Sequence, residues 1–109
     1  MFGRSKAEHH SKPFSRLRRL LSHGNLWIYI LSLMKRKKVY AYALPQHIFS
    51  KFGFLPSKLM IYFVLYKLES EGLIASSFEE RRKYYALTRK GKQELLRAKK
   101  FLAQLSRRL

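Results

Sequence analysis

The fold is decided by the stretch SKLMIYFVLYKLESEGLIASSFEERRKYYALT, which runs from Ser57 to Thr88. Its first half is a dense apolar segment in which Ile61, Leu65 and Leu68 recur at helical spacing. Gly72 follows directly and is a typical stop for such a helix, because glycine tolerates the left-handed conformation of a helix end. The segment therefore predicts a helix that opens at Pro56, holds Ser57 in its first turn and ends at Gly72.

Two strand-like segments follow the glycine. Residues 73–78 and 83–88 are rich in apolar, aromatic and small side chains, and the connection between them is charged. On the second segment Tyr85 and Leu87 share one face, as alternate residues of a strand do. The order helix, glycine, strand, basic tip, strand is that of a winged helix-turn-helix. The expected fold class is therefore mainly α with a small β-hairpin (α+β).

Outside this stretch, apolar periodicity and helix-end signals predict the remaining elements. Asn25 is expected to cap a central buried helix, Thr88 to cap the last one, and Phe49 to face inward beside Ile48 and Phe52. The predicted organisation is a flexible basic arm over 1–12 and one domain over 13–109 that includes a C-terminal helix, 89–109. Within it we expect helices from Pro13 to a stop at Gly24, over 26–35 and over 45–52, and a strand over 39–43.

Composition narrows the choice of partner. The 109 residues carry a formal net charge of +18, from 24 Lys and Arg against 6 acidic residues. Such self-repulsion favours a polyanionic partner, with nucleic acid first and an acidic membrane surface second. The chain has no Cys, and its longest apolar run near the front, 26–34, is too short for the ~20 residues of a bilayer span. We expect a cytoplasmic, nucleoid-associated protein without a cofactor.

Two segments resemble one family closely. Glu71-Gly72-Leu73-Ile74, followed by Arg82-Lys83-Tyr84-Tyr85-x-Leu87-Thr88-x-x-Gly91, is similar to the PadR family of transcriptional regulators. The family has His-Gly before the helix that corresponds to 45–52, and this chain has Tyr40-Ala41 there. The wing lacks the Gly/Pro-rich tip common in the family. The resemblance implies a homodimer that binds double-stranded DNA, with an added C-terminal dimerisation helix.

Candidate DNA contacts come from four places. The start of the helix that opens at Pro56 can reach bases or phosphates, and the wing tip carries three cations. Basic clusters lie on the helix that begins at Pro13 and directly after the helix over 26–35. Gln46 is one of few side chains able to read adenine. An ordinary charged surface is the alternative for each cation. Tyr62 and Tyr66 are either partly covered core aromatics or contacts to a DNA groove or a partner subunit. The candidate set is Ser57, Lys58, Tyr62, Arg81, Arg82, Lys83, Gln46, Lys37, Lys38, Arg16, Arg18 and Arg19.

The last helix carries leucines at alternating spacings of three and four, which is the pattern of a coiled-coil seam. Packing onto the helix's own domain is the alternative explanation. Two heptads are too short to pair alone, so aromatic residues of the N-terminal segment are expected to assist. The predicted dimer interface is Leu95, Ala98, Leu102, Leu105, Leu109, Phe14 and Trp27.

Other functions have weaker support. Glu69 and Glu71 lie two apart on a helix and so face different ways, and the chain has no Asp. We therefore expect no catalytic and no metal-binding residues, and read His9-His10 as part of a polar tail. The main alternative to a sequence-preferring regulator is a non-specific architectural DNA-coating or RNA-binding protein. A membrane-surface protein using the basic amphipathic segment 13–21 is a further alternative.

Overall fold

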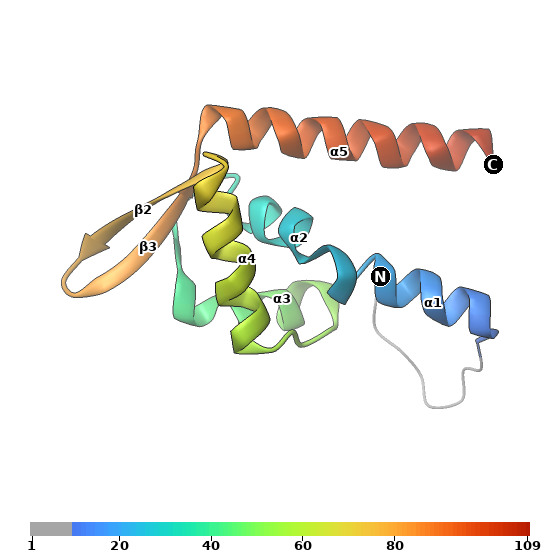
Figure 1. Ribbon diagram of the computed structural model, residues 1–109, viewed down its shortest axis with the longest axis horizontal. Helices are drawn as coiled ribbons and strands as arrows, with labels where there is room; N and C mark the ends of the chain where they lie inside the picture. The colour runs from blue at the N-terminus through green and yellow to red at the C-terminus, as the bar shows by residue number, and fades with distance from the viewer. Residues whose placement is uncertain (1–9) are drawn as a thin grey trace.

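The computed structural model describes residues 10–109. Five α-helices and three strands follow one another along this part of the chain, with short 3-10 turns before α2 and α3 (Figure 1). None of the helices within it combines the length and the apolar character needed to cross a bilayer. The elements are α1 (Lys12–Leu20), η1 (His23–Asn25), α2 (Leu26–Leu33), β1 (Val39–Tyr40), η2 (Ala41–Ala43), α3 (Leu44–Phe52), α4 (Lys58–Ser70), β2 (Ile74–Glu79), β3 (Arg82–Leu87) and α5 (Arg89–Arg108).

The core lies between α2, α3 and α4, with the sheet and the start of α5 closing it. Ile30 of α2, Ile48 of α3 and Ile61 of α4 are fully buried in it. The central burial predicted for the helix over 26–35 is confirmed for α2. Phe49 is half exposed instead of facing inward, because Ile48 and Phe52 already occupy the inner side of α3.

The sheet has three strands in the order β1-β3-β2, all antiparallel. β1 pairs Val39 with Tyr85, so the chain before α3 adds a third strand to the predicted hairpin. That strand was expected to run to Ala43, but the backbone turns into η2 after Tyr40 and leads directly into α3. We call the hairpin β2–β3 the wing. It projects from the helices at one end of the molecule (Figure 1).

The junction between the wing and α5 is tightly built. Thr88 caps α5 as predicted, since its hydroxyl oxygen accepts a hydrogen bond from the Gly91 N–H at 3.0 Å and donates to the Gly72 carbonyl at 2.7 Å. A Cβ added at Gly91 would lie 2.0 Å from the Leu73 carbonyl oxygen. This contact gives a physical reason for the Thr-x-x-Gly spacing noted in the sequence.

The N-terminal elements differ from expectation at their ends. Ser11 caps α1, so the helix begins at Lys12 and ends at Leu20 instead of continuing to Gly24. Asn25 precedes α2 without a side-chain cap, because its amide donates to the Leu20 carbonyl and accepts from the Trp27 indole. The predicted flexible arm falls mainly on residues 1–9, outside the described residues.

α1 is joined to the domain through the start of α2. The Tyr29 hydroxyl donates a hydrogen bond to the Leu21 carbonyl oxygen, and burial raises the pKa of this phenol above its ordinary value. No side chain of α1 itself is buried. Both α1 and the far half of α5 extend away from the wing, toward the other end of the molecule (Figure 1).

Candidate nucleic-acid interface

The start of α4 presents the residues predicted for base contact. Ser57 is the N-cap, and its hydroxyl oxygen accepts a hydrogen bond from the Met60 N–H at 3.2 Å. Lys58, the first helical residue, places its ammonium 3.2 Å from the Tyr42 hydroxyl and 4.4 Å from the centre of that ring. Tyr42 therefore holds the Lys58 cation at the N-terminus of α4. The sequence did not predict this role for the tyrosine.

α4 carries two apolar stripes on opposite sides. The inner stripe of Ile61, Leu65 and Leu68 is buried. The second, which we call the outer stripe, consists of Leu59, Tyr62, Phe63 and Tyr66, with exposed fractions of 80%, 44%, 53% and 72%. Tyr66 is therefore not a covered core aromatic, and Tyr62 is nearly half open to solvent.

Two of the three wing cations, Arg82 and Lys83, lie against aromatic rings. The Arg82 guanidinium lies 5.1 Å from the centre of the Tyr40 ring, and the Lys83 ammonium lies 5.4 Å from that of Tyr85. These cation–π contacts hold both charges along the hairpin. Arg81 sits at the tip, in the two-residue turn that it forms with Glu80.

The basic segment after α2 joins the wing. Lys38 forms an ion pair with Glu79 and lies 5.7 Å from the centre of the Tyr84 ring, so it is tied to the end of the hairpin. This pair also turns one of the two wing carboxylates toward a cation. Lys37 is exposed beside it, and Gln46 is exposed on the first turn of α3.

The α1 arginines lie apart from the wing, at the other end of the fold (Figure 1). Arg18 and Arg19 line a cavity of about 370 Å³ together with Phe49, Gly53 and Leu55, which belong to α3 and the α3–α4 connection. Arg16 is exposed and shares a helix face with Arg19, since they lie three positions apart. The α1 cations thus flank the helix-turn-helix on the side away from the wing.

The predicted dimer residues divide into two groups. Leu95 is buried in the core of its own domain and Ala98 is half-buried, which corrects the expectation that the seam begins at Leu95. Leu102, Leu105 and Leu109 remain exposed. On the N-terminal side Phe14 is exposed and Trp27 is partly buried against the core.

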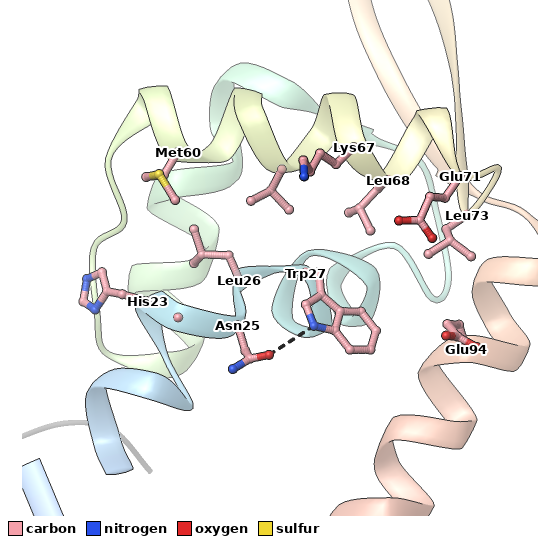
Figure 2. Close-up of a pocket in the computed structure, with 12 residues that line it drawn as sticks. His23, Asn25, Leu26, Trp27, Met60, Lys67, Leu68, Glu71, Leu73 and Glu94 are labelled. Carbon is pink, nitrogen blue, oxygen red and sulfur yellow. Dashed lines mark hydrogen bonds between the residues drawn. The ribbon is translucent and has the colours of Figure 1, made fainter. Parts of the chain in front are cut away.

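A cavity of about 310 Å³ separates α4 from the start of α2 and from α5, as Figure 2 shows. Trp27 lines its floor, and its indole N–H donates to the Asn25 amide oxygen at 3.3 Å. Lys67, Glu71 and Glu94 add polar groups to the apolar lining. Within residues 10–109, no group of three or more His, Cys, Asp or Glu side chains is placed so that it could hold a metal ion.

Sequence reasoning missed several members of the exposed surface. Leu59 was not considered, and neither were Tyr40 and Tyr42 beneath the cations. Phe63 and Tyr66 were considered as contacts to a groove or a partner subunit but were left out of the candidate set. A signal did exist for α4, because that helix has more apolar residues than one buried stripe can hold. No local signal marks Tyr40 or Tyr42, since their partners come from elements distant in sequence.

The fold combines a three-helix core with a helix-turn-helix and a basic wing hairpin in a three-stranded sheet. This combination defines the class of winged helix-turn-helix regulators. The chain belongs to the PadR-like family of transcriptional regulators, whose family model matches residues 30–97. No curated protein sequence matches the chain.

Solved structures of the same family share this fold. A PadR family transcription regulator from Clostridium difficile is 29% identical, with a TM-score of 0.72, over 77% of this chain and 93% of that one. A second, from Eggerthella lenta, is 28% identical with a TM-score of 0.74 over 86% of each chain. A PadR-like regulator from Bacillus cereus is 29% identical with a TM-score of 0.69, over 82% of this chain and 89% of that one.

Proposed function

We propose that this regulator works as a homodimer that occupies operator DNA, with α4 in the major groove and the wing on the adjacent backbone. The observation that carries the proposal is that Lys58 at the start of α4 and Arg82 and Lys83 on the wing each lie against an aromatic ring. Phosphate contacts supply affinity and register, whereas base contacts from α4 supply sequence preference. Such a protein acts on the nucleoid in the cytoplasm.

The dimer part of the proposal rests on two exposed apolar faces at the same end of the molecule. Phe14, Leu17 and Leu20 on α1 and Leu102 and Leu105 on α5 are each between 38% and 50% exposed. Apolar faces of this kind are hazardous on a monomer and are normally covered. A two-fold partner would cover them and would set two recognition helices about one DNA turn apart, near 34 Å, on an inverted repeat.

The first prediction tests the wing. Replacing Arg82→Ala together with Lys83→Ala should weaken binding to every duplex similarly and make the dependence of log K on log salt shallower by about one for each phosphate that the protein no longer neutralises. The control pair Lys99→Ala with Lys100→Ala removes the same charge from exposed positions of α5. Fluorescence anisotropy over a salt series measures both slopes. Equal slopes for the wing pair and the wild type would remove the wing from the interface.

Selection from a random duplex pool separates the regulator from the alternative of a non-specific coat protein. Enrichment of an inverted repeat supports operator binding, and a variant changed at Ser57 or Lys58 should then enrich a different sequence. A pool that returns unenriched, at an affinity equal to that for random duplex, supports the architectural alternative.

A further inference from the structure

The outer stripe of α4 is an apolar helix face that does not contact the core. Leu59, Tyr62, Phe63 and Tyr66 follow the spacing i, i+3, i+4, i+7, which is the pattern of a helix face that buries against something. That face is nevertheless exposed, while the inner stripe already supplies the contact with the core. No element within residues 10–109 covers this face, which leaves it available to an occupant from outside this part of the chain.

The charges around the stripe identify what kind of occupant fits. Lys58 precedes the stripe, and Lys67 places its ammonium 5.4 Å from the centre of the Phe63 ring. Glu69 is the single acidic residue of α4, and its carboxylate accepts a hydrogen bond from the Ser76 hydroxyl at 2.6 Å, on the side of the wing strand β2. An apolar strip edged by cations and free of outward carboxylates matches an apolar feature on a polyanion.

The major groove of DNA offers one such feature. Only thymine presents a methyl group there, and apolar side chains contact it, whereas Arg and Lys read guanine and Asn and Gln read adenine. Between Lys58 and Ser70, α4 contains no Arg, Asn or Gln. Lys58 and Lys67 are therefore the side chains of α4 that can contact guanine, and the helix has no amide side chain to read adenine bidentately. Its outer stripe is suited to contact with thymine.

We propose that the outer stripe of α4 reads thymine through the C5-methyl group, with Leu59 and Phe63 as the main specificity-determining side chains. This inference rests on the proposed function, because it assumes that α4 enters the major groove. It predicts operator half-sites with thymines in the groove positions that face α4, and selectivity that comes from burial of methyl groups. The tyrosine hydroxyls remain available for phosphate or water.

The test uses the duplex that selection enriches, prepared with thymine or with deoxyuridine at the half-site positions. Deoxyuridine keeps every Watson–Crick hydrogen bond and lacks only the methyl. Each contacted methyl should contribute about fourfold in affinity, so two contacts give a thymine-to-uracil ratio of about 16 for the wild type. In the variant Leu59→Ala with Phe63→Ala that ratio should fall toward one.

A matched control is Phe49→Ala, which removes a half-exposed aromatic from α3 and should leave the ratio unchanged. Because truncation on α4 also weakens binding, the ratio is measured at low salt, where phosphate contacts keep the complex intact. Leu59 and Phe63 are mostly exposed, so the variant should retain the wild-type circular dichroism and thermal unfolding.

The outcomes are distinguishable. A wild type that binds the enriched duplex equally with thymine and uracil overturns methyl readout and leaves the regulator intact. A wild type that enriches no duplex overturns the proposed function itself. A double variant that changes the oligomeric state by light scattering, with the thymine-to-uracil ratio unaltered, assigns the outer stripe to self-association and overturns the inference.

Discussion

Arg81 has a backbone conformation that glycine adopts more easily than any other residue. Glu80 and Arg81 have φ values of 50° and 70°, the pair of positive angles that closes a two-residue hairpin of type I′. For a residue with a side chain, the left-handed region costs about 1–2 kcal/mol. The wing tip thus carries a cation at a position where local backbone preference favours glycine.

The second prediction follows from this conformation. Arg81→Gly should raise the free energy of unfolding by about 0.5–1 kcal/mol through relief of the left-handed strain. The same change should weaken DNA binding, because the tip loses its cation. Thermal denaturation and fluorescence anisotropy measure the two effects.

Arg81→Ala is the matched control, since it removes the charge and keeps the strain. It should weaken binding without a gain in stability. An Arg81→Gly variant less stable than the wild type would contradict the strain assigned to the tip, and one that bound DNA equally well would contradict the phosphate contact.

At the scale of single elements, the start of α5 is held by close backbone contacts. Gly91 lies against the Leu73 carbonyl, and Thr88 joins the Gly72 turn to the first turn of α5. The helix is therefore positioned by backbone contacts with the turn between α4 and β2. A change at this point should move α5 relative to the wing.

The third prediction is that Gly91→Ala destabilises the protein by about 3 kcal/mol or more, because the added methyl meets backbone that cannot move aside. Chemical denaturation followed by circular dichroism measures the loss. Lys92→Ala, at the exposed next position, should be close to neutral. Equal stability of the Gly91 and Lys92 variants would show that α5 can shift freely at its start.

Elements with local signals were predictable from the sequence. Gly53 ends α3 in the left-handed conformation, Thr88 caps α5, and alternate residues of β3 face the core as expected. These features depend on a residue and its near neighbours, so the sequence contains them. The candidate cations of the wing and of the Lys37–Lys38 segment were predictable for the same reason, from composition and order along the chain.

Features that depend on distant contacts were not predictable. The pairing of Val39 with Tyr85 joins segments 46 positions apart, and the residues around Val39 give no indication of this partner. Periodicity likewise identifies an apolar stripe on a helix without naming what covers it. On α5 the stripe divides, with Leu95 covered by the helix's own domain and Leu105 left exposed, and on α4 a second stripe remains uncovered.

At the scale of the whole molecule, the described part of the chain measures 46 × 31 × 21 Å. The exposed leucines of α1 and of the far half of α5 belong to helices that extend to the end away from the wing (Figure 1). A cavity of about 430 Å³ between α2 and α5, lined by Trp27, Ala98 and Leu102 among others, continues this apolar surface. The proposed dimer would fill that region and leave both wings free.

The fourth prediction tests this assembly. Leu102→Glu with Leu105→Glu should convert a dimer at tens of micromolar into a monomer, measured by light scattering. The added carboxylates reduce the repulsion between two strongly basic chains, so a loss of association would report the missing apolar burial and not a charge effect. Leu96→Glu, at an exposed position on another side of α5, should remain dimeric. A double variant that stays dimeric would place the interface elsewhere.

The excess of cations has a consequence for stability. Ion pairs join Lys38 to Glu79 and Arg97 to Glu94, yet the sequence leaves a net +18 that its own carboxylates cannot neutralise. Added salt screens this repulsion and should raise the melting temperature of the free protein. The same salt releases bound DNA, so the melting temperature of the complex should fall toward that of the free protein. In dilute buffer the duplex acts as a folding ligand, and in concentrated salt the dissolved ions replace it.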